Sequence, residues 1–101
     1  MITVHDLQFQ DNAVVSQSVL KQKGGNVTLF AFAKGQELSE HTAPFDALVH
    51  VIEGSMDITI DGTVHTLVAG QLLVMPANLP HALTATQPSR MILTMIRDMA
   101  T

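Results

Sequence analysis

The chain of 101 residues contains no cysteine, tryptophan or tyrosine, and lysine and arginine together number only five. Without cysteine, a disulfide framework, a zinc–thiolate site and a thiol nucleophile are all excluded. Nine acidic residues give a formal net charge of −4 at pH 7. This balance argues against a nucleic-acid partner, because binding to a phosphate backbone needs a basic surface.

The chain also has no long hydrophobic run. No stretch approaches the roughly 20 consecutive apolar residues that a membrane span requires. Residues 1–20 show neither the basic start nor the apolar segment of a signal peptide. We therefore expect no membrane partner and a cytoplasmic location.

Apolar residues are nevertheless abundant, at 47% of the chain against 14% charged residues. This composition is typical of a compact globular protein, and the length favours one domain over residues 1–101. A chain of this size buries only about two-thirds of the surface that its unfolded form exposes. The apolar excess therefore predicts that a second copy covers part of the surface, as in a homodimer.

The hydrophobic pattern is that of β-strands almost throughout, with little helix expected. Short apolar or alternating runs separated by turn residues indicate an antiparallel all-β barrel or sandwich. Asp61-Gly62 predicts a two-residue hairpin, because both central positions of a type I′ turn need a positive φ. The predicted strands are 27–33, 46–53, 56–60, 63–68, 71–75, a strand that begins at His81, and 90–97.

Two segments, 35–54 and 70–85, carry paired motifs. The first motif is glycine, five residues, histidine, one residue, histidine, three residues, glutamate, six residues and glycine. In this chain the five motif positions are occupied by Gly35, His41, Ala43, Ala47 and Gly54. The second motif is glycine, five residues, proline, one residue, glycine, two residues, histidine, three residues and asparagine. Its five positions are occupied here by Gly70, Pro76, Asn78, His81 and Ala85. Because the spacing of both motifs is complete, the chain resembles the cupins, and among them the small single-domain proteins of RmlC-like type.

The resemblance implies an all-β fold, the antiparallel jelly-roll β-barrel of the cupins. It places the barrel core at residues 27–96 and leaves an N-terminal region at 1–26. Small cupins usually add an N-terminal strand to the sheet of a partner. Residues 13–20 are the candidate for that strand here.

The resemblance also implies a metal-ligand set of three histidines and one glutamate. This chain keeps His41 and His81 at two of those positions and has Ala43 and Ala47 at the others. We expect His41 and His81 to line one pocket. Imidazole suits several divalent transition metals, so Zn, Ni, Fe, Mn or Cu are the candidate ions. Catalytic sites normally take three protein ligands, so two histidines predict weak binding.

Three other side chains are candidates for a substitute third ligand. His50 lies three residues after Ala47, and strand alternation turns it to the opposite face, which favours an outward or interface histidine. His65 is expected opposite Ile58 if the hairpin loop has two residues. Asp46 also points away by alternation, and it is the reserve carboxylate should the preceding turn bring it inward.

The two alanines also admit a positive interpretation, an apolar pocket that carries two imidazoles. Such a composition is typical of small-molecule sites. The alternative is a filled core, in which Phe45 or Met75 occupies the space. The predicted lining residues are Ala43, Ala47, Val49, Leu83 and Ala85.

The favoured function is the binding of a small organic molecule, with a divalent metal ion weakly held at His41 and His81. The alternative is a metal-dependent cupin enzyme of the dioxygenase or isomerase type with a substitute third ligand. A structural or regulatory module that acts through another protein is a third hypothesis. Acid–base catalysis by His41 or His81 without a metal is a fourth.

Overall fold

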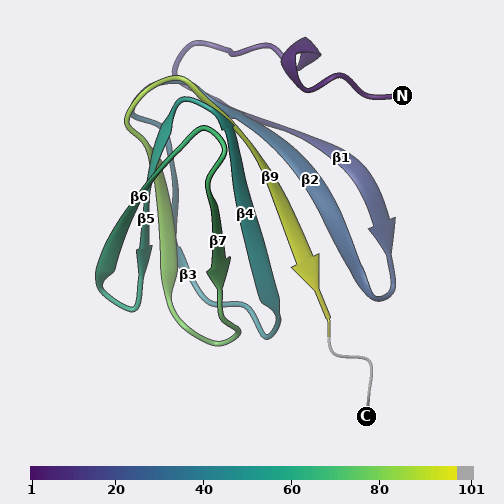
Figure 1. Cartoon of the computed structure of the whole chain (residues 1–101), viewed down its shortest axis with the longest axis vertical. Coiled ribbons are helices and arrows are strands. Elements are labelled where there is room, and N and C mark those ends of the chain that lie inside the picture. The colour runs from purple at the N-terminus through teal and green to yellow at the C-terminus, as the bar shows by residue number, and fades with distance from the viewer. Residues whose placement is uncertain (98–101) are drawn as a thin grey trace.

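The structure is a computed structural model that describes residues 1–97, which fold into two antiparallel sheets (Figure 1). A short 3-10 helix, η1 (Val4–Asp6), precedes the strands. The nine strands of the described residues are β1 (Val14–Gln22), β2 (Gly25–Phe32), β3 (Glu37–His41), β4 (Asp46–Glu53), β5 (Ser55–Ile60), β6 (Thr63–Val68), β7 (Leu72–Met75), β8 (His81–Ala85) and β9 (Ser89–Ile96).

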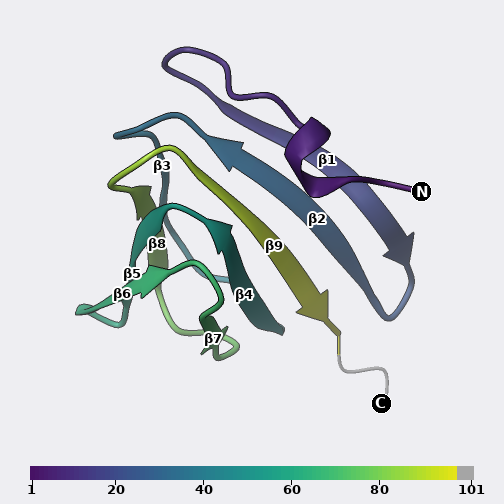
Figure 2. The same cartoon turned by 45° about the horizontal axis from the view of Figure 1, so that its top comes forward.

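The larger sheet has the order β1-β2-β9-β4-β7 and the smaller one β3-β8-β5-β6. Both orders place strands that are distant in sequence beside each other, which is the Greek-key connectivity of a jelly roll. The predicted all-β antiparallel fold is therefore confirmed. The hairpin of β1 and β2 extends beyond the four-stranded sheet in both views (Figures 1 and 2).

Most predicted strands match the observed ones closely, and β4 and β6 have the predicted bounds. Strand β3 was not predicted, because its residues Glu37–His41 are mostly polar and exposed. Residues 13–20 largely fall in β1, which pairs antiparallel with β2 at the edge of this chain's own sheet.

Two glycine turns fix the strand connections. Asp61 and Gly62 have φ values of 47° and 84°, as the predicted type I′ hairpin requires. Gly54, between β4 and β5, has a φ of 88°, and a Cβ there would lie 2.3 Å from the Pro88 carbonyl oxygen. Only glycine fits a site with both constraints.

The core lies between the two sheets and is filled by aliphatic, methionine and phenylalanine side chains. Its buried members are Phe32, Ala47, Val49, Val51, Met56, Ile58, Ile60, Leu67, Met75, Leu83, Ala85 and Met91. Among residues 1–97, no helix has both the length and the apolar character needed to cross a membrane.

Candidate functional site

Backbone hydrogen bonds join the two motif segments at two places. The Gly35 N–H donates to the Ala85 carbonyl at 2.7 Å, and the Ala85 N–H donates to the Gln36 carbonyl at 2.9 Å. The Asn78 N–H donates to the Ala43 carbonyl at 2.8 Å. Residues that are distant in sequence are thereby held side by side, which brings the histidines of the two motifs to one place.

His41 ends β3 and His81 begins β8, and the two are register partners in the four-stranded sheet. Their Nε2 atoms are 3.0 Å apart, and the ring centroids are 4.3 Å apart with the planes at 72°. His81 is buried, with 6% of its surface exposed, whereas His41 is exposed. The pair therefore lies where the barrel interior meets the solvent.

Backbone carbonyl groups orient both rings. Nδ1 of His41 lies 2.7 Å from the Ser39 carbonyl oxygen, and Nδ1 of His81 lies 3.2 Å from that of Leu79. A carbonyl oxygen only accepts, so each Nδ1 must carry a proton to make its bond. In the neutral rings both Nε2 atoms are then acceptors that face each other. The arrangement calls for one electrophile between them, a proton or a metal ion.

Burial and the neighbouring ring decide which electrophile is favoured. Desolvation, followed by the charge of His41, lowers the pKa of His81 below its usual 6.5, against a smaller opposing effect from the Leu79 carbonyl. Burial disfavours the imidazolium form because it removes the water that would solvate the charge. Near neutral pH the His81 ring is neutral, which is the state that binds metals.

The pair has the donor chemistry for a divalent transition metal but not a full ligand set. A separation of 3.0 Å between the two nitrogens suits two ligands on one ion, since metal–nitrogen bonds are about 2.0–2.1 Å. Within residues 1–97, no group of three or more histidine, cysteine, aspartate or glutamate side chains could hold a metal. The residues therefore fit an ion held by two imidazoles, with its other positions open to water or to a ligand.

The candidate third ligands lie elsewhere. His50 pairs with Ile92 whereas Ala47 pairs with Met95, so the two face opposite sides of β4, as predicted. His65 pairs with Ile58, also as predicted.

The Asp46 carboxylate is engaged in a different contact. Its Oδ1 accepts a hydrogen bond from the Ala77 N–H at 2.8 Å. Asp46 thus fixes the loop between β7 and β8 that leads to the histidine at the start of β8.

Four of the five predicted pocket residues lie in the closely packed core. Ala47, Val49, Leu83 and Ala85 are at most 5% exposed and belong to the core cluster. Ala47 pairs with Met75, itself 2% exposed. Ala43 is half-buried in the loop before β4. Of the five, Ala43 is the one that lies outside the core cluster.

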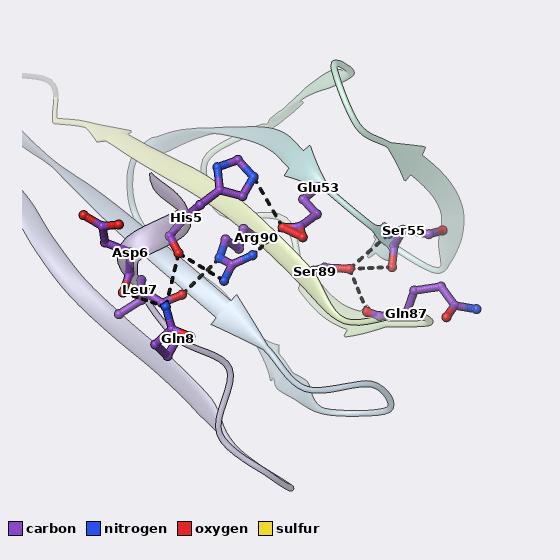
Figure 3. Close-up of polar contacts among 9 residues, drawn as sticks. All are labelled: His5, Asp6, Leu7, Gln8, Glu53, Ser55, Gln87, Ser89 and Arg90. Carbon is purple, nitrogen blue, oxygen red and sulfur yellow. Dashed lines mark hydrogen bonds and ion pairs between the residues drawn. The ribbon is translucent and has the colours of Figure 1, made fainter. Parts of the chain in front are cut away.

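A charged cluster at the start of β9 was not predicted (Figure 3). Arg90 is 6% exposed; its Nε donates to the Leu7 carbonyl at 3.0 Å, and its Nη1 pairs with the Glu53 carboxylate. The guanidinium carbon lies 4.1 Å from the centroid of the Phe9 ring, and the His5 ring lies 3.6 Å from Glu53. An arginine at the start of a strand gives no sign in the sequence that it will bind a segment more than 80 residues away.

Comparison with known proteins agrees with this geometry. A family model described as "Cupin domain" matches residues 28–97. None of the curated proteins compared with the chain is similar to it.

Several solved structures are similar over nearly the whole chain. A conserved protein of unknown function from Streptococcus pyogenes is 31% identical, with a TM-score of 0.92, over 99% of this chain and 89% of that one. A cupin superfamily protein from Desulfitobacterium hafniense is 26% identical, with a TM-score of 0.90, over 94% and 87%. A cupin 2 conserved barrel domain protein from Leptotrichia buccalis is 31% identical, with a TM-score of 0.90, over 94% and 46%. The family match spans most of the residues that form the two sheets and both histidines, and on this basis the chain belongs to the cupin family.

Proposed function

We propose that this cupin barrel binds a small organic molecule at the His41–His81 pair, with a divalent transition metal ion weakly held between the two Nε2 atoms. The observation that carries the proposal is the convergence of two ring nitrogens at 3.0 Å while both Nδ1 atoms face carbonyl groups. Facing lone pairs are unfavourable unless an electrophile lies between them. A ligand oxygen on a bound ion, or an acidic O–H of the ligand itself, satisfies that requirement.

The surroundings support a ligand with an apolar part. Leu38 and Leu79, which lie close in sequence to His41 and His81, are partly buried against the core. Ala43 is half-buried. Small-molecule sites combine such apolar walls with a few polar groups that fix orientation. In this proposal the two imidazoles provide the polar contacts and the side chains of Leu38, Ala43 and Leu79 contact the rest of the molecule.

The metal, when bound, would supply Lewis acidity to an oxygen of the ligand. His41 and His81 would hold it, and the carbonyl groups of Ser39 and Leu79 would keep the rings oriented. Outer hydrogen bonds of this kind set the tautomer of ligating histidines. With only two protein ligands, we expect the site to bind the metal with a much larger dissociation constant than a three-ligand site.

We further propose that the chain acts as a homodimer in the cytoplasm. Its support is the apolar composition and the large hydrophobic side chains that remain exposed, among them Leu72 and Ile96 at 58% and 62%. A metal-dependent cupin enzyme is the second possible outcome, and it requires a third ligand donated by the bound molecule.

The test is elemental analysis followed by calorimetric titration with Zn²⁺ and Ni²⁺, on protein purified without chelator or nickel resin. We expect binding in the wild type, and its loss in His41→Ala. His50→Ala is the matched control, because it removes an imidazole from the opposite side of β4 and should leave binding unchanged. The Ala43→His variant restores the second histidine of the motif and should tighten binding at least tenfold.

Organic ligands are then screened by thermal shift with a set of small carboxylic and hydroxy acids, with and without Zn²⁺. A shift that disappears in His41→Ala supports the proposal. No metal uptake and no shift that depends on His41 would refute it.

A further inference from the structure

The outer face of the five-stranded sheet is unusually apolar where no other part of the described chain covers it. Register fixes which side chains share this face: Ile96, Thr94 and Ile92 of β9 alternate with inward-facing Met95, Leu93 and Met91. The same alternation gives the outer face Leu48 and His50 of β4, Leu72 and Val74 of β7, and Val27 of β2.

The N-terminal segment covers one end of this face. Arg90, on the outer face of β9, holds the carbonyl groups of Leu7 and His5 and lies against Phe9. Ala31, the register partner of Arg90, is fully buried there. Figure 2 shows this segment running over β1 and β2. The other end of the face, around Ile96, carries no such cover from residues 1–97.

Exposed apolar side chains lie on the part of this face that the N-terminal segment leaves uncovered. Ile96, Leu72, Val74 and Leu20 are 62%, 58%, 55% and 51% exposed. Two of them, Leu20 on β1 and Val74 on β7, end one row of register partners that runs through Val27, Thr94 and Leu48, beside Ile96. The exposed side chains therefore form a patch and are not scattered. Monomeric proteins rarely expose contiguous apolar patches beyond a few hundred Å² unless a partner covers them.

The patch has a ridge between two hollows. Ile96 borders a hollow of about 200 Å³ that Leu20, Val27 and Thr94 also line. It borders a second hollow, of about 240 Å³, with Asp46, Leu48 and Val74. A projecting side chain beside hollows on the same surface is self-complementary, as a two-fold interface requires.

Charge distinguishes this patch from the other sheet. Asp46, a carboxylate that borders it, already accepts the Ala77 N–H. The outer face of the four-stranded sheet instead carries Asp57, hydrogen-bonded to Thr66, next to polar threonines. Interface cores are depleted of charged residues, so the five-stranded sheet has the surface that two copies of an acidic chain can bring together.

We propose that the patch around Ile96 is the surface on which a second copy of this chain packs, with the Ile96 side chain of each copy entering a hollow of the other. This rests on the proposed homodimer and assigns its interface. Five strands about 4.8 Å apart and five residues of about 3.3 Å each give a footprint of about 400 Å². Side-chain relief raises the accessible area towards the roughly 800 Å² per partner of a standard interface.

The test uses two lysine substitutions on the patch, Ile96→Lys and Val74→Lys, and the control Val64→Lys. Val64 is 58% exposed on β6 of the other sheet, so its exposure matches theirs. Mass is measured by light scattering with refractive-index detection, because the chain has no tryptophan or tyrosine to absorb at 280 nm. Thermal melts by circular dichroism check that each variant folds.

We expect the wild type and Val64→Lys to be dimers, and both patch variants to be folded monomers or to dissociate at least a hundredfold more readily. In this cysteine-free chain, Ile96→Cys should also form a disulfide-linked dimer under mild oxidation, and Val64→Cys should not. A dimer that survives both patch substitutions overturns this assignment but leaves the homodimer standing. A wild type that is monomeric at all concentrations overturns both.

Discussion

Arg90 should contribute more to stability than any other cationic side chain among residues 1–97, because it binds the N-terminal segment to the sheet. It donates to the Leu7 carbonyl at 3.0 Å and to the His5 carbonyl at 3.4 Å, pairs with Glu53, and lies over the Phe9 ring. We predict that Arg90→Ala lowers the free energy of unfolding by about 3 kcal/mol.

The magnitude follows from those contacts. Hydrogen bonds from a charged group contribute about 1.5–3 kcal/mol, and the Leu7 bond is the better of the two in length. A cation–π contact contributes about 0.5–2 kcal/mol. The ion pair adds at most about 0.5 kcal/mol, because the Glu53 side chain is 37% exposed and solvent screens it.

The assay is urea unfolding followed by far-ultraviolet circular dichroism. Arg97→Ala is the control, since Arg97 is exposed and lies 5.6 Å from the Phe45 ring; we expect a loss below about 0.5 kcal/mol. In a chain that lacks residues 1–9, Arg90→Ala should cost only about 1 kcal/mol, because the carbonyl groups and the Phe9 ring are gone. An equal cost in both backgrounds would refute the assignment of Arg90 as the anchor of the N-terminal segment.

Three further predictions concern the site and the turns. Burial lowers the pKa of His81 below 6.5, so below pH 6.5 the unfolded chain binds more protons than the folded one. The free energy of unfolding, measured in the presence of a chelator, should therefore fall as the pH drops below 6.5. A rise would mean that the histidine pair shares a proton. Gly54→Ala should cost more than about 2 kcal/mol in urea unfolding, because φ is 88° and a Cβ would lie 2.3 Å from the Pro88 carbonyl oxygen. Gly62→Ala should cost about 1 kcal/mol, because beyond its chain neighbours no atom of the described chain lies within 4 Å of the added Cβ; equal costs would contradict the steric argument. Ala47→Glu should cost at least about 3 kcal/mol, because that position is 5% exposed within the core; a stable variant would show room for the missing carboxylate.

Local sequence information predicted much of the fold. Alternation placed His50 on the opposite face of β4 from Ala47, and the Asp61-Gly62 turn fixed the register that sets Ile58 opposite His65. These features depend on side-chain period and on backbone preferences, which act between near neighbours. The exposed and polar β3 was missed because it owes its strand conformation to pairing with β8.

By itself, the sequence determined the cupin family, through motif spacing, and the absence of two of the four metal-ligand residues. Tertiary structure alone decided that the Nε2 atoms of His41 and His81 meet at 3.0 Å, because strand pairing across 40 residues sets that distance. It also decided that Arg90 is buried under the N-terminal segment and that Ile96 is left exposed. Alternation places a side chain on one face of a sheet, but what covers that face depends on contacts between distant segments.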